Sequence, residues 1–126
     1  MFIKRAVSSI EISMIILQTM RHQPESCPLG NPKNLDIMIE WLENLEPLAT
    51  KYGIKVIGAW ADRAGHTIYA IFETPNVKTF SKFEIDPQNI PIITLNYIEK
   101  NIVITAKDLL PFFKEYKTAT QAIKKE

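Results

Sequence analysis

Short apolar runs alternate along this chain with segments rich in proline, glycine and charge. Residues 12–22 open the pattern: an alternating stretch passes into a continuous apolar run at residues 14–17, typical of a strand buried on both faces. Residues 23–32 then contain three prolines and a glycine. A stiff loop without regular structure is therefore expected between the first strand and the next element.

A long amphipathic helix is predicted after this loop. Asn31 is a favourable N-cap, and Pro32 suits the first helical position. Gly53 suits the left-handed residue that ends a helix. Pro47 is expected to kink the helix, because it removes one backbone hydrogen bond. One face carries apolar residues at helical spacing, namely Leu35, Met38, Ile39, Leu42, Leu45, Ala49 and Tyr52.

Two strands are predicted next, at residues 54–60 and 66–73. Residues 61–65 between them have the length of a hairpin loop. Thr74-Pro75 resembles a second helix start of the cap-plus-proline kind. The apolar side of that helix would consist of Val77, Phe80 and Phe83.

The last third of the chain is predicted to contain strand and then helix. Residues 86–89 break the second helix, and residues 90–97 form a further apolar strand. Residues 102–104 resemble a short extra strand after a turn. Thr105 with Asp108 resembles a capping box that opens a C-terminal helix, expected to cover an edge or an open face of the sheet. Pro111 makes the first turn of that helix irregular.

The core order is therefore βαββαβ, which predicts an α+β, ferredoxin-like fold with an antiparallel sheet. We expect one domain over residues 1–126, with its core at about 12–98 and a C-terminal extension at about 99–126. Helices would cover one face of the sheet, yet the strands are apolar on both faces. The sheet of a second copy of the chain is the simplest way to bury the other face, so the pattern predicts a dimeric α/β barrel. The alternative is a monomer whose terminal segments fold over the bare face.

Composition and charge exclude several classes of protein. The net charge is +1, and the lysines are scattered rather than clustered, which disfavours nucleic-acid binding. No stretch approaches the roughly 20 apolar residues of a membrane span. Cys27 is the single cysteine, so no internal disulfide can form. These features predict a cytoplasmic protein.

One cluster of chemically capable residues follows from the topology. In a split βαβ sheet the first strand ends where the third begins, so the only two histidines, His22 and His66, should meet. Cys27 lies five residues past His22. Two imidazoles and a thiolate match a catalytic zinc site with an open fourth position. Alternatively, Cys27 is a nucleophile activated by a histidine, since it precedes a helix N-terminus that favours thiolate.

A purely structural interpretation stands beside this one. A histidine at a strand end is often a surface residue, and a lone cysteine is often a small buried hydrophobe. The spacing from His22 to Cys27 is not a standard zinc signature. Glu73 should lie at the opposite end of its strand from His66, so we do not count it with the cluster.

The motifs at these positions resemble a known family. A His-x-x-Glu-x-Cys-Pro stretch runs from His22 to Pro28, and a hairpin carrying Gly65-His66 precedes the acidic strand end at Glu73. These features resemble an uncharacterised archaeal and bacterial family of the dimeric α/β-barrel superfamily, over about residues 17–97. The resemblance implies the fold, the homodimer and the joint presence of the two histidines and the cysteine. The N-terminal extension and long C-terminal helix depart from that pattern.

The sequence therefore predicts a small dimeric protein whose His/Cys pocket binds a small molecule or a transition metal such as zinc or iron. It would be a small enzyme if His22, Cys27 and His66 are catalytic. The alternative is a non-catalytic module, either a ligand sensor or a structural dimer, in which the histidines are surface residues. Fold alone does not decide between these functions.

Overall fold

The computed structural model describes residues 14–125. Residues 12 and 13, which open the predicted first strand, lie outside this part. Four strands form one antiparallel sheet in the order β2-β3-β1-β4. Their bounds are β1 (Met14–Arg21), β2 (Lys55–Asp62), β3 (Thr67–Thr74) and β4 (Tyr97–Val103). Because β1 lies between β3 and β4, strands that follow one another along the chain are not all neighbours in the sheet.

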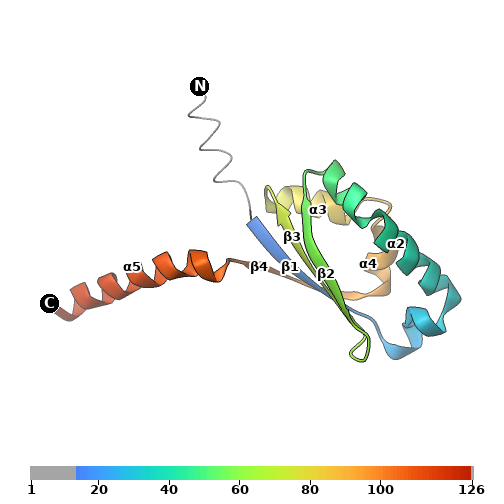
Figure 1. The fold of residues 1–126 in the computed structure, drawn as a ribbon, viewed down its shortest axis with the longest axis horizontal. Helices are drawn as coiled ribbons and strands as arrows, with labels where there is room; N and C mark the ends of the chain where they lie inside the picture. Colours follow the sequence, from blue (N-terminus) through green and yellow to red (C-terminus); the bar gives the residue numbers. More distant parts are fainter. Residues whose placement is uncertain (1–13, 126) are drawn as a thin grey trace, which may run out of the picture.

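Three helices cover one side of this sheet (Figure 1), namely α2 (Pro32–Lys51), α3 (Val77–Glu84) and α4 (Ile90–Leu95). The first crossover runs through α2 and the second through α3 and α4. The prediction of an α+β class with an antiparallel sheet is confirmed. The strand order and crossovers are compatible with a ferredoxin-like fold.

The hydrophobic core lies between the sheet and these three helices. Phe72, Phe80 and Phe83 form an aromatic cluster at its centre, with ring centroids 5.2 to 5.6 Å apart. Aromatic rings at such spacings stabilise a core beyond the area that they bury. The other buried apolar residues are Ile16, Met20, Met38, Trp41, Leu45, Leu48, Ala49, Ile54, Ala70 and Ile92.

The predicted ends of the long helix are confirmed. The side chain of Asn31 accepts a hydrogen bond from the backbone N–H of Asn34 at 3.1 Å, so it caps α2. Gly53 adopts φ +70° just beyond the helix, where a residue with a Cβ would be strained. The start of the second helix was predicted wrongly at Thr74-Pro75. Thr74 ends β3, and Asn76 caps α3 by accepting from the N–H of Thr79.

The predicted strand at residues 90–97 is wrong. Residues 90–95 form α4, and the fourth strand is β4, which includes the predicted turn at residues 99–101. A β-branched run of this length fits a buried helix as well as a strand. Pro91 lies in the first turn of α4, where its missing N–H costs nothing. Asn89 holds the helix start in place, accepting from the indole N–H of Trp41 at 2.9 Å.

A bulge in β2 changes which residues share a face of that strand. The pairing with β3 shifts between Val56 and Gly58, which leaves Ile57 as the extra residue. Strict alternation along residues 54–60 predicts that Trp60 shares a face with Val56. Instead it lies with Gly58 on the open face, where a Cβ on Gly58 would meet the indole at 2.5 Å. The hairpin loop is also one residue shorter than predicted, because β2 continues to Asp62 and only residues 63–66 connect it to β3.

The C-terminal helix α5 (Ala106–Lys125) projects away from the domain (Figure 1). Its predicted capping is confirmed, since the side-chain oxygen of Thr105 accepts from the N–H of Asp108 at 3.1 Å. The expectation that it covers a sheet edge or face of its own chain is wrong, because α5 packs extensively against no other described element. Among residues 14–125, no helix has both the length and the apolar character needed to cross a bilayer.

Candidate functional site: the His22, Cys27 and His66 cluster

The ladder between β1 and β3 brings the two histidines together. Arg21 pairs with Thr67 in the last register position, and the backbone N–H of His22 donates to the carbonyl of His66 at 3.2 Å. This bond continues the antiparallel pairing by one step, so His22 and His66 are cross-strand neighbours. The prediction that both histidines lie at one end of the sheet is confirmed.

The two rings approach edge to face. Nδ1 of His66 lies 3.3 Å from Nε2 of His22, and the ring planes make an angle of 79°. Two ring nitrogens at this separation need a shared proton or a shared cation between them, because facing lone pairs repel. Nε2 of His22 and Nδ1 of His66 are therefore the atoms that face the centre of the site.

The loop after β1 delivers Cys27 to the same place. Two short 3₁₀ turns, η1 (Pro24–Ser26) and η2 (Pro28–Gly30), flank it. The N–H of Cys27 donates to Pro24 and its carbonyl accepts from Gly30. Asn34 of α2 donates to the carbonyl of Ser26 at 2.9 Å, which ties the loop to the helix. Proline rings and these hydrogen bonds hold the half-buried thiol in position.

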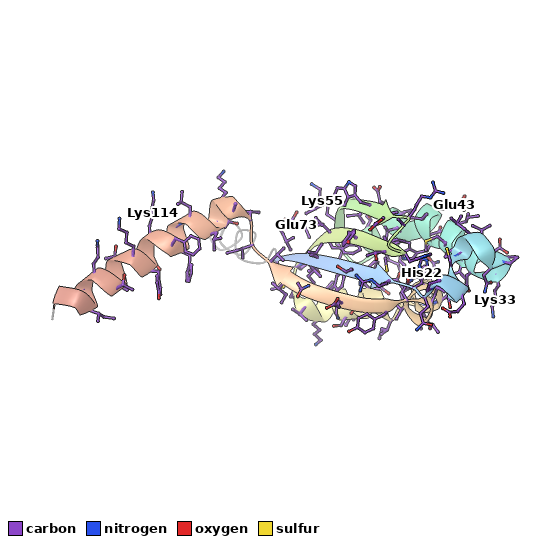
Figure 2. All side chains as sticks on the ribbon, turned by 90° about the horizontal axis from the view of Figure 1, so that it is seen from below. His22, Lys33, Glu43, Lys55, Glu73 and Lys114 are labelled. Carbon is purple, nitrogen blue, oxygen red and sulfur yellow. The ribbon has the colours of Figure 1, made fainter. Side chains whose placement is uncertain are left out.

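The three side chains form one cluster. One potential ligand atom from each of His22, Cys27 and His66 lies within 4.8 Å of the other two. Within residues 14–125, no other group of three or more histidine, cysteine or acidic residues has this spacing. Glu73 lies toward the far end of the sheet from His22 (Figure 2), paired with Ile15, in agreement with the prediction.

His66 adopts a conformation that non-glycine residues seldom take. Its φ is +53°, at the end of the β2–β3 loop. Within that loop the Asp62 carboxylate accepts from the N–H of Gly65 at 3.1 Å, and the hydroxyl of Thr67 donates to the Gly65 carbonyl at 2.7 Å. A Cβ on Gly65 would meet the Asp62 carboxylate, so a larger residue there would displace this carboxylate from the loop. The tight loop therefore imposes the left-handed backbone on His66.

The surroundings of His22 disfavour its charged form. Burial lowers the pKa of His22 below its usual 6.5, and the charge of His66 lowers it further. The Asn96 side chain opposes this shift by favouring the protonated ring. Nδ1 of His22 and Oδ1 of Asn96 are nevertheless both buried without a hydrogen-bond partner.

Asn96 is a site residue that sequence reasoning missed. It ends α4, with its amide N–H donating to the carbonyl of Ile92 at 2.8 Å. The wrong prediction of a strand over residues 90–97 placed it inside regular structure, where nothing distinguished it. An asparagine between an apolar helix and an edge strand was the only signal available.

The cluster forms the polar end of a pocket of about 270 Å³. Asp62 and Arg63, from the loop before His66, also line it. No family model matches the chain, and no curated protein matches it. The resemblance to a dimeric α/β-barrel family therefore stays a prediction.

Proposed function

We propose that this protein binds a transition metal through His22, Cys27 and His66, with a fourth position open toward the pocket. Two imidazoles and a thiolate are ligands that zinc accepts in catalytic sites, and iron also accepts imidazole. The observation that carries the proposal is the convergence of the three potential ligand atoms within 4.8 Å. Among these metals we propose zinc, because imidazole and thiolate are both among its usual ligands.

The spacing of the ring nitrogens supports this choice. Zinc–nitrogen bonds of about 2.05 Å at tetrahedral angles put two nitrogens about 3.3 Å apart. Nε2 of His22 and Nδ1 of His66 are separated by 3.3 Å. A zinc–sulfur bond of about 2.3 Å puts the sulfur about 3.6 Å from each nitrogen. Because the ligand atoms lie within 4.8 Å of one another, the sulfur of Cys27 has to approach by at most about 1 Å to complete the tetrahedron.

The surroundings of His22 add a second argument. When Nε2 binds a metal, the ring proton must lie on Nδ1, which then needs an acceptor. Oδ1 of Asn96 is buried without a partner, as is Nδ1 of His22. With a metal on Nε2, the Nδ1–H of His22 would donate to Oδ1 of Asn96. Both buried atoms would then have a partner, and Asn96 would orient the ring.

Metal analysis tests the proposal. Purified protein, stripped with chelator and reloaded with zinc, should hold one zinc per chain. Cys27→Ser, His22→Ala and His66→Ala should each weaken zinc by more than the roughly 10- to 100-fold that follows loss of an outer-shell partner, and Asn96→Ala by about that amount. Glu25→Gln is the matched control, since Glu25 is an exposed residue of the same loop.

A reactive Cys27 without metal is the second candidate. Its sulfur lies within 4.8 Å of a ligand nitrogen of each histidine, near enough for a small movement to bring it to a base. Alkylation separates the two functions. Metal binding predicts that zinc protects Cys27 from iodoacetamide. Rapid alkylation at neutral pH, unchanged by zinc and slowed in His22→Ala, would favour the nucleophile. A protein with no zinc and an inert thiol would support a non-catalytic sensor or structural module.

We also propose that two copies of the chain pair through the open face of the sheet. On the side opposite α2, α3 and α4, the described strands carry Trp60, Tyr69 and Ile71, and Trp60 is 56% exposed. Four strands of about eight residues make a face of about 25 by 20 Å. Its flat area of about 500 Å² is smaller than the roughly 800 Å² that each partner buries in a standard interface, so such a dimer also needs contacts outside the sheet.

A further inference from the structure

The pocket beside the cluster has an apolar body. It lies between the edge strand β2, the N-terminal half of α2 and the η2 turn. From α2 it is lined by Leu35, Met38 and Leu42, which share one helix face, and from β2 by Ala59 and Ala61. Leu42 is 54% exposed, so this apolar surface is open to solvent. The arrangement fits the apolar part of a small molecule.

One end of the pocket is polar, and its lining includes one acidic and one basic side chain. Besides His22, Cys27 and His66, it is lined by Asp62 and Arg63. The Asp62 carboxylate accepts the backbone N–H of Gly65, so it serves the hairpin loop. The guanidinium of Arg63 has no hydrogen-bond or ion-pair partner among residues 14–125. An unpaired guanidinium beside a metal position is suited to an anionic head group, because it can bind a carboxylate through two N–H donors.

We propose that the pocket binds a small monocarboxylate with an apolar chain, its head group at the open metal position beside Arg63 and its chain along Leu35, Met38 and Leu42. This inference rests on the proposed metal centre. The volume of about 270 Å³ is at the lower limit of ligand pockets, so the chain is short to medium in length.

A series of straight-chain carboxylates tests the proposal. Acetate, butyrate, hexanoate and octanoate are titrated into zinc-loaded protein by calorimetry, and the zinc content of each sample is measured first. Affinity should rise about fourfold for each methylene, the equivalent of about 0.8 kcal/mol, until the chain fills the pocket. Hexylamine, with the same chain and a cationic head, should bind at least tenfold more weakly than hexanoate.

Two variants locate the binding. Ala61→Phe should fill the apolar body and remove the dependence on chain length while leaving zinc content unchanged. Ala64→Phe is its matched control, because Ala64 is exposed in the same hairpin and does not line the pocket. Arg63→Gln should weaken every member of the series by a similar factor of about tenfold. Lys55→Gln, at the other end of β2, should change nothing.

The outcomes separate this inference from the metal proposal. Stoichiometric zinc with no chain-length dependence, or with an unchanged series in Ala61→Phe, would overturn the ligand class and leave the metal centre standing. Chain-length-dependent binding that Arg63→Gln weakens, in protein that holds no zinc, would support the pocket assignment and overturn the metal centre. Binding lost at high protein concentration and regained on dilution would assign the pocket to a second copy instead.

Discussion

At the scale of single residues, His66 combines an unfavourable backbone with a place in the cluster. A left-handed conformation costs a residue with a Cβ about 1–2 kcal/mol. At φ +53° glycine would avoid that cost, yet the position holds the imidazole whose Nδ1 faces His22. Strain of this kind is common at functional sites.

The substitution His66→Gly tests whether the backbone of His66 is strained. The metal-free variant should be about 1 kcal/mol more stable than His66→Ala, because alanine keeps the strained φ while both variants lose the imidazole. Neither variant should gain stability from zinc, whereas wild type should. Chemical denaturation with and without zinc measures both effects. Equal stability of the two variants would mean that the loop relaxes and imposes no strain.

Asp86 makes a second prediction, on pH. Its carboxylate accepts from the Tyr52 hydroxyl at 2.6 Å and from the N–H of Gln88, and Lys51 lies 3.6 Å away. These partners, Tyr52 first, lower the pKa of Asp86 below its ordinary 3.8. The unfolded chain then binds more protons near that pH, so this contribution to stability is complete above 3.8 and is lost as the pH falls through the folded-state pKa.

Asp86→Asn should therefore lower the Tm at neutral pH and flatten its decline in acid, because the variant has no carboxyl to protonate. Thermal unfolding followed by circular dichroism from pH 7 down to about 2 measures this. Asp36→Asn, an exposed position on α2, is the control. A decline in Tm as steep in Asp86→Asn as in wild type would contradict the lowered pKa.

At the scale of elements, much of the architecture was predictable because local signals agreed with the fold. The caps at Asn31 and Gly53 bounded α2, and the strand order followed from the split βαβ pattern. Two of the failures have clear physical causes. Residues 90–95 are apolar and β-branched, which fits helix and strand alike until packing decides. The bulge at Ile57 depends on pairing with β3, and it reverses every face after it.

Some residues of the candidate site were likewise predictable from the sequence, and others were not. His22 and His66 were predictable as neighbours, since antiparallel pairing alone brings the end of β1 to the start of β3. The position of Cys27 was harder to predict, because it depends on the path of a proline-rich loop. The hydrogen bond from the Asn34 side chain to the Ser26 carbonyl helps to fix that path. Asn96 was not predictable, because its position follows from α4, the element that the sequence pattern concealed.

At the scale of the whole molecule, two apolar surfaces lack a cover within residues 14–125. One is the open face of the sheet. The other is a stripe along α5 with the spacing of a coiled-coil seam, made of Leu109, Phe112, Tyr116, Ala119 and Ile123. Phe112 and Tyr116 are 56% and 62% exposed and stack on each other. Exposed aromatic residues in a contiguous group are typical of interfaces between proteins.

The proposed homodimer is tested by making one surface polar at a time. Sedimentation should show a dimer at micromolar concentration, and Tyr69→Lys, at the centre of the open face, should shift it to monomer, because a buried unpaired lysine opposes association. The double variant Phe112→Ser, Tyr116→Ser is the matched change on α5. It should leave a sheet-mediated dimer intact. If the α5 variant dissociates and Tyr69→Lys does not, the copies pair through α5 and the sheet-face dimer is wrong. A wild-type monomer at micromolar concentration would remove both arrangements. It would also leave the pocket beside His22, Cys27 and His66 complete within one chain, because every residue that lines it comes from the same copy.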